Sequence, residues 1–93
     1  MKVAELEGES LDIWVANVVG DPGGLCSYST EWEHGGPLIE RLRICIGYRE
    51  VPPHWGADFQ DDVPYRWWGT NPLMAAMRAV VASKFGDEVP EVE

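Results

Sequence analysis

One stretch, residues 70–85, limits the possible folds more than any other, because it predicts a helix with almost no charged surface. Thr70 or Asn71 can cap its start, since a short side-chain oxygen can accept from the backbone N–H groups of the first turn. Pro72 suits the first helical position, where no N–H is needed, and Gly86 ends the helix. A helix with such clear ends is expected to organise the rest of the chain.

Apolar side chains occur on both sides of this helix. At about 100° per residue, one side gathers the larger ones: Leu73, Met74, Ala76, Met77, Val80 and Val81. The other side repeats alanine, where a surface helix normally carries Lys and Glu, at Ala75, Ala79 and Ala82. We therefore expect cover on most of the circumference, from the chain's own sheet on one side and from another helix or a second subunit along the alanines.

Arg78 is the only charged residue between Pro72 and Ser83, so its guanidinium is expected to be partly enclosed. An enclosed guanidinium needs acceptors, because it does not deprotonate. The favoured interpretation is a structural clamp from Arg78 to a carboxylate of the preceding loop, for which the candidates are Glu31, Glu33 and Glu40. The alternative is an anion site for the carboxylate or phosphate of a ligand.

Length and charge limit the class of protein. A chain of 93 residues with 45% hydrophobic residues makes one folded domain with one modest core. Its net charge of −9 disfavours nonspecific attraction to nucleic acid or to an anionic membrane. No signal peptide and no apolar run near the ~20 residues of a membrane span are visible, so an intracellular protein is expected. Cys26 and Cys45 are then most simply free thiols, and a single bridge between them is the alternative.

A second helix is predicted near the N-terminus. It starts at Gly8 or Ser10, and Gly20 can supply the left-handed residue after its end. Its apolar stripe consists of Leu11, Trp14, Val15, Val18 and Val19. Residues 2–6 form a short lead that can add an edge strand, and residues 21–24 form a turn.

The segment from residue 25 to residue 37 predicts an ordered loop. Ser29 or Thr30 can cap a single helical turn at residues 31–33, which Gly35-Gly36-Pro37 would then end. A large Trp32 at the centre of this loop needs burial, so we expect it to pack underneath.

Residues 41–49 alternate with period two, which predicts a half-buried strand. One face of this strand would carry Leu42, Ile44, Ile46 and Tyr48. Pro52-Pro53 stops it, a second strand is expected at residues 55–59 and a third within 63–68, with a turn at 60–62. The acidic tail, residues 86–93, should fray unless it is docked. The predicted fold is a single α+β domain, in which two helices pack on one face of a two- or three-stranded antiparallel sheet.

Two segments resemble the NinX-like family of small phage and prophage proteins. Residues 29–41 contain the spacing Thr-x-Trp-x-x-Gly-Gly-Pro-x-Ile-Glu-Arg, and the second segment is the Asn-Pro helix start at residues 71–78 together with residues 81–89. With the first helix, the similarity covers most of the chain. The chain departs from the family pattern at Glu31, where Asp is expected, at Glu7, where a Ser/Thr-type cap is expected, and over residues 59–67, where a shorter segment is expected. The family is of unknown function, so the resemblance implies a phage or prophage origin and the bacterial cytoplasm, and no activity.

Two residue sets raise the question of a ligand or metal site. His34-Gly35-Gly36-Pro37 can present N–H groups to an anion, yet it lacks the strand before and helix after that a phosphate loop has, so a plain turn is favoured. A Cys₂His₂ set is formally present in Cys26, His34, Cys45 and His54. It lacks the close pair, such as Cys-x₂-Cys, that is typical of zinc sites, so no metal site is predicted.

No catalytic constellation is complete. The candidate nucleophiles, with His34 or His54 as base, lie in no strong motif: Cys26, Cys45, Ser27, Ser29 and Ser83. The acid pairs Asp61/Asp62 and Glu31/Glu33 are more typical of solvated charge than of a glycosidase site. We therefore expect no enzyme and no cofactor.

Trp67 and Trp68 are neighbours in the third predicted strand, so they cannot both point into one core. One must be exposed or covered by something else, and tryptophan is enriched at protein interfaces, which predicts a contact surface here. The arginines that can border this surface are Arg43, Arg49 and Arg66.

The favoured function is a noncatalytic interaction protein with a host or phage protein as partner. It would also form a homodimer through the alanines or through the Trp67/Trp68 face. A decoy that imitates the phosphates of DNA is disfavoured, because the middle of the chain carries most of the arginines. The competing class is a small-molecule or anion-binding protein, or an enzyme, centred on Trp32, His34, Gly35, Gly36, Arg41 and Arg78.

Overall fold

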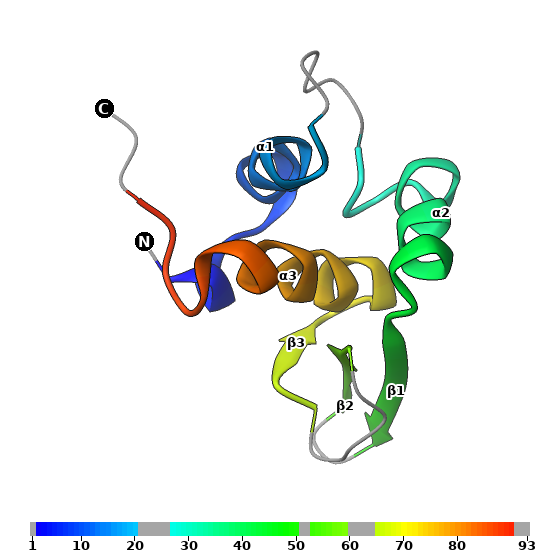
Figure 1. Ribbon diagram of the computed structural model, residues 1–93. Coiled ribbons are helices and arrows are strands. Elements are labelled where there is room, and N and C mark those ends of the chain that lie inside the picture. Colours follow the sequence, from blue (N-terminus) through cyan, green and yellow to red (C-terminus); the bar gives the residue numbers. More distant parts are fainter. Residues whose placement is uncertain (1, 21–26, 51–52, 60–64, 91–93) are drawn as a thin grey trace.

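The computed structural model describes residues 2–20, 27–50, 53–59 and 65–90 (Figure 1). Its helices are the 3₁₀-helix η1 (Val3–Glu5) and the α-helices α1 (Gly8–Val19), α2 (Trp32–Leu42) and α3 (Pro72–Phe85). Its strands are β1 (Cys45–Glu50), β2 (Pro53–Asp58) and β3 (Trp67–Gly69), and they form one antiparallel sheet in the order β1-β2-β3. The predicted α+β class is confirmed, with one α-helix more than expected.

The ends of α1 and α3 follow the sequence signals. The side-chain oxygen of Asn71 accepts from the backbone N–H of Met74 at 2.8 Å, and Pro72 occupies the first turn. Gly20 adopts a left-handed conformation, with φ of 78°, after α1. These signals act within one turn of chain, so they do not depend on tertiary contacts.

Helix α3 lies in the middle of the molecule, with the sheet on one side and α1 and α2 on the other (Figure 1). Ala75 and Ala79 are 0% and 1% exposed within the chain itself, and Ala82 is half-buried. The expected cover on both sides of α3 is therefore present, and a single chain provides it. No second subunit is needed to bury the alanines.

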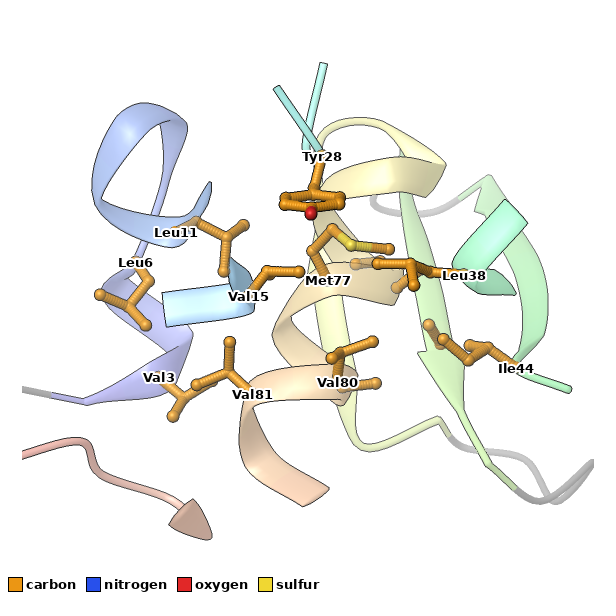
Figure 2. Close-up of a cluster of buried hydrophobic side chains, with 14 of the residues drawn as sticks. Val3, Leu6, Leu11, Val15, Tyr28, Leu38, Ile44, Met77, Val80 and Val81 are labelled. Atoms are coloured by element: carbon orange, nitrogen blue, oxygen red, sulfur yellow. The ribbon is translucent and has the colours of Figure 1, made fainter. Parts of the chain in front are cut away.

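The sequence predicted that the alanines of α3 would face another helix or a second subunit and that the larger side chains would face the sheet. The structure shows the reverse. Ala79 and Ala82 line a small hollow together with Asp58 of β2 and Trp67 of β3, so these alanines face the sheet. Figure 2 shows the larger side chains of Met77 and Val81 in one cluster with residues of η1, α1 and α2. Small helix residues suit the sheet side, because Trp55 and Trp67 project from the sheet and fill that space.

Helix α2 corrects the expected loop at residues 25–37. The chain is helical through Gly35-Gly36-Pro37, which was expected to end a single turn, and the first residue before the helix is Glu31, without a side-chain cap. Pro37 is exposed, and it removes the N–H that would bond the carbonyl of Glu33, but the helix continues past it to Leu42. The helix ends at Arg43, whose φ is 55°.

The first strand is shorter than expected because α2 takes residues 41–42, and it begins at Cys45. Across the sheet, Ile46 pairs with Ala57 and Ala57 with Trp67, and these three contribute to the core on the α3 side. The other two strands lie close to the predicted ranges, at residues 53–58 and 67–69. The expected turn at 60–62 lies outside the described residues.

The two ends of the described chain lie together. Lys2 forms a β-bridge with Glu88, and the N–H of Val3 donates to the carbonyl of Asp87 at 2.9 Å. Val3 and Val89 are 0% and 4% exposed. The N-terminal lead is therefore part of the core instead of an edge strand of the sheet, and the tail is docked as far as residue 90.

Candidate functional site

The outer face of the sheet is the face turned away from α3. Strand alternation places these residues on it: Cys45, Gly47, Arg49, His54, Gly56, Asp58 and Trp68. Trp67 packs against the core and Trp68 lies on the outer face, which confirms that the two neighbouring tryptophans point in opposite directions.

Two glycines make the outer face flat enough for aromatic rings to lie on it. Gly47 and Gly56 are opposite each other on β1 and β2. A Cβ atom on Gly56 would lie 2.9 Å from Cε3 of Trp68, and one on Gly47 would collide with the ring of Tyr65. The rings of Tyr65 and Trp68 therefore occupy the space that side chains at these two positions would fill.

The rings on the outer face form a chain of edge-to-face contacts. The centroids of His54 and Trp68 are 4.2 Å apart with an interplanar angle of 66°, and those of Tyr65 and Trp68 are 6.4 Å apart at 77°. All three residues are half-buried. Arg49, directly opposite His54, is exposed at the rim. The arrangement is an aromatic centre with the cation of Arg49 at its border.

Arg78 reaches from α3 to the edge of β3, where it links two segments of the chain. Its Nε donates to the carbonyl of Leu6 at 2.9 Å, and its Nη1 donates to the carbonyl of Trp68. Burial lowers the pKa of Arg78, and the charge of Glu7 opposes this shift. The side chain is half-buried, and two of its N–H groups donate to backbone acceptors.

The structure shows backbone acceptors for Arg78 where the sequence predicted a carboxylate. Glu31, Glu33 and Glu40 are exposed on or next to α2, and no ion pair joins them to Arg78 in the described part of the chain. The reason is the direction of the side chain, which extends to Leu6, just after η1, and to Trp68 of β3 instead of to α2. Backbone carbonyls carry no sequence signature, so no pattern of residue types could have identified them.

The other predicted contact residues lie on α2 and do not form one site with Arg78. Trp32 was expected to be buried and is 56% exposed, because Gly36, one turn later, leaves room for the ring along the outside of the helix. Gly35 is buried against the carbonyl of Tyr28 and the side chain of Leu73. Arg41 is exposed. Because Gly35 and Gly36 are helical, they do not form the anion-binding loop considered from the sequence.

His34 has a structural role in the described chain. Its Nδ1 accepts from the backbone N–H of Ser27 at 3.0 Å, and its Nε2 lies 3.7 Å from a carboxylate oxygen of Glu33. The Nδ1 atom is therefore engaged by the backbone. His34 fixes the start of the segment that leads into α2.

Asp12 is an anchoring residue that sequence reasoning missed. It lies on α1, is 8% exposed and accepts from the backbone N–H of Ser29 at 2.8 Å. A single Asp on a helix next to apolar residues looks like a solvent-facing charge, so the sequence contains no signal for this bond. Asp12 and His34 together hold the segment before α2, and neither is part of the outer face.

An open hollow of about 790 Å³ lies at the β3 end of the sheet, between the N-terminal segment and the end of α3. It is lined by Lys2, Ala4, Arg66, Trp67, Phe85, Asp87 and Glu88. Two cations and two anions among these residues balance each other, so the hollow has no net preference for one sign of charge. Arg66, which was expected beside the tryptophan surface, borders this hollow.

Metal-binding and cysteine chemistry receive no support from the described residues. No group of three or more His, Cys, Asp or Glu side chains among them could hold a metal ion. Cys45 is half-buried on β1, and Cys26, its candidate disulfide partner, lies outside the described residues.

Comparison with known families adds the decisive observation. Residues 25–84 match the model of the family described as "Bacteriophage P22, NinX", which is more than half of the chain. The chain belongs to the NinX family. The matched region includes α2, the whole sheet and all but the last residue of α3, so both the outer face and Arg78 lie within the NinX segment. No curated protein matches this chain.

This NinX protein is therefore a phage-type protein of unknown function. In the described residues, no helix has both the length and the apolar character required to cross a membrane.

Proposed function

We propose that this NinX protein is a noncatalytic interaction protein that binds a phage or host protein through the outer face of its sheet. The observation that supports this proposal is the outer face itself. Among the described residues, no helix packs on it, and it presents the partly exposed rings of His54, Tyr65 and Trp68. Aromatic residues in such a setting are the commonest anchors of protein interfaces.

The charge of the surroundings indicates the chemistry of the partner. Arg49 is exposed beside the rings, whereas the whole chain carries a net charge of −9. A nucleic acid would be repelled by that net charge, so a protein segment is favoured. Apolar side chains on the partner would cover the rings, and an acidic side chain would face Arg49. We place this interaction in the cytoplasm of the bacterial host.

Affinity capture with matched charge reversals tests this proposal. Wild-type protein, Arg49→Glu and Arg41→Glu would each be used to capture proteins from a lysate of host bacteria, with quantitative mass spectrometry. Both arginines are exposed, but Arg49 is on the outer face and Arg41 is on α2. We expect a protein captured by wild type to be lost with Arg49→Glu and kept with Arg41→Glu. Loss of the captured protein with Arg41→Glu and its retention with Arg49→Glu would contradict the proposal and assign the interface to α2 and its exposed Trp32.

A small-molecule-binding protein is the second candidate function. The volume of the hollow beside Trp67, about 790 Å³, lies within the range of ligand pockets. A thermal-shift screen of charged metabolites tests it, because a ligand that binds only the folded protein raises the unfolding midpoint. A midpoint rise that Arg66→Ala abolishes and Arg49→Ala preserves would favour the hollow over the outer face.

A further inference from the structure

The two edge strands of the sheet, β1 and β3, differ in length and in how their outer backbone groups are bonded. At one edge, β3 has only three residues, and the carbonyl of Trp68 is occupied by Arg78. At the other edge, β1 has six residues, and no other segment that the structure describes pairs with its outer side (Figure 1). Native proteins usually protect an edge with proline, lysine, a bulge or a covering segment. Strand β1 contains no proline and no lysine, its charged residues Arg49 and Glu50 are at one end, and no described segment pairs with its outer side, so the rest of this edge is open to pairing.

The position of Pro53 identifies which backbone groups of β1 are open. Pro53 is opposite Glu50 and has no N–H, so these two residues cannot exchange the two bonds of a hydrogen-bonded pair. Because hydrogen-bonded and non-hydrogen-bonded pairs alternate, the bonds to β2 fall at Arg49, Gly47 and Cys45. The N–H and C=O groups of Ile46 and Tyr48 therefore point away from β2, toward the open edge.

The same assignment follows independently from β3. Arg78 donates to the carbonyl of Trp68 at the outer edge of β3. The backbone N–H and C=O of Trp68 therefore point away from β2. Gly56 is opposite Trp68, so its backbone N–H and C=O point the other way, toward β1, where they pair with Gly47. The arguments from Pro53 and from Trp68 thus agree that the backbone N–H and C=O groups of Ile46 and Tyr48 point toward the outer edge of β1.

We propose that β1 pairs antiparallel with β1 of a second copy of this chain, with the two-fold axis at Gly47. In this register, Ile46 of one copy is opposite Tyr48 of the other, and Cys45 is opposite Arg49. Tyr48 is 51% exposed, and the second strand would cover it with an apolar neighbour. Cross-strand pairs of an aromatic and a β-branched residue are favourable.

Neighbouring registers are less complementary. With the axis at Tyr48, Ile46 would be opposite the charged Glu50, and with the axis at Arg49, two arginines would face each other. The axis at Gly47 opposes no like charges. Because five residues per strand make a small interface, the dimer forms at high protein concentration.

The paired sheets would carry both outer faces on the same side, because a two-fold axis perpendicular to the sheet keeps each face on its own side. The dimer therefore doubles the aromatic surface without covering it. The pairing does not depend on the proposed partner protein, so each proposal can fail without the other.

Size-exclusion chromatography with light scattering over a concentration series tests the dimer. For wild type, the mass is expected to rise toward roughly twice the monomer mass. Tyr48→Pro removes an edge donor and leaves the bonds to β2, so it should fold, as circular dichroism would check, and stay monomeric. Wild type that remains monomeric at every concentration overturns the proposal, and the outer edge of β1 would then be a candidate for pairing with a strand of another protein.

A disulfide experiment tests the register without relying on Tyr48→Pro. In a Cys26→Ser background, Arg49→Cys places a thiol opposite Cys45 of the second copy, in a non-hydrogen-bonded pair whose Cα atoms are about 4.5 Å apart. Within one chain, these two positions are about 13 Å apart along the strand and cannot bridge. Mild oxidation should therefore give a covalent dimer, in which Cys45 of each copy is linked to the thiol introduced at position 49 of the other.

Glu50→Cys in the same background is the matched control, because this position lies on the other side of the strand from Cys45. It should remain monomeric under the same oxidation. Absence of the Arg49→Cys dimer, or equal cross-linking of both variants, overturns the register.

Discussion

Gly35 and Gly36 are adjacent in sequence and have opposite surroundings. Gly35 is buried where α2 meets the carbonyl of Tyr28, and a Cβ there would lie 2.8 Å from a methyl carbon of Leu73. Gly36 faces outward, and the nearest atom to its Cβ position belongs to Trp32 at 3.5 Å. Two residues that look like one turn signal in the sequence therefore have different physical reasons for being glycine.

Alanine substitution should separate these two glycines. Gly35→Ala is expected to lower the free energy of unfolding by about 2 kcal/mol or more, because backbone and core must shift to accept the methyl group. Gly36→Ala should change it by less than about 1 kcal/mol, since the gain in helix propensity is opposed by the restriction on a residue before proline. Urea unfolding followed by circular dichroism measures both. Equal changes in the free energy of unfolding would show that the close contact between Gly35 and Tyr28 does not exclude a methyl group.

At the scale of elements, the sequence predicted α1, α3 and the approximate strands but missed α2. The signals at Asn71, Gly20 and Gly86 are local, so they could be read directly. Gly35-Gly36-Pro37 was interpreted as a helix end, because the packing that requires Gly35 involves the carbonyl of Tyr28 in the preceding segment and Leu73 on α3. The same limit applies to Arg78, whose acceptors are backbone carbonyls. Local propensity is visible in one sequence, whereas close approach between elements is not.

Arg78 links α3 to β3 and to the segment between η1 and α1, and its removal should affect stability. Arg78→Met leaves the carbonyls of Leu6 and Trp68 without their donor, so the free energy of unfolding should fall by about 1–3 kcal/mol. Arg41→Met, at an exposed position on α2, is the control and should change it by less than about 0.5 kcal/mol. Denaturant unfolding gives both values. An unchanged midpoint for Arg78→Met would mean that water replaces the guanidinium at no cost.

The contribution of Arg78 should not depend on pH in the neutral range. Its pKa is lowered by burial, so the folded protein would release this proton more readily than the unfolded chain, and stability from this group would rise only in strongly alkaline solution. The difference in unfolding free energy between wild type and Arg78→Met should therefore be constant from about pH 5 to pH 9. A slope in this range would assign the effect to another titrating group.

At the scale of the whole molecule, the NinX match and the folding unit do not coincide. Residues 25–84 match the family, but the core also includes these buried residues outside that range: Val3, Leu6, Leu11, Val15 and Val89. Each fully buried apolar side chain contributes about 1.5–3 kcal/mol, so their sum is comparable to the ~5–15 kcal/mol stability of an ordinary domain.

A fragment of residues 25–84 should therefore not fold cooperatively. Its far-ultraviolet circular dichroism is expected to show little helix, and its thermal melt no sigmoidal transition, whereas a fragment of residues 2–90 should behave like the full chain. A cooperative transition in the shorter fragment would show that η1 and α1 are accessory to the core.

The position of α3 between two layers also determines how the protein opens. A helix with the sheet on one side and two helices on the other cannot expose its backbone while its neighbours stay in place. The amide protons of residues 75–81 should therefore exchange with deuterium only through global unfolding, and those of α2 near the exposed Pro37 through local opening. Hydrogen exchange followed by NMR would give one common opening free energy along α3 and lower, uneven values along α2.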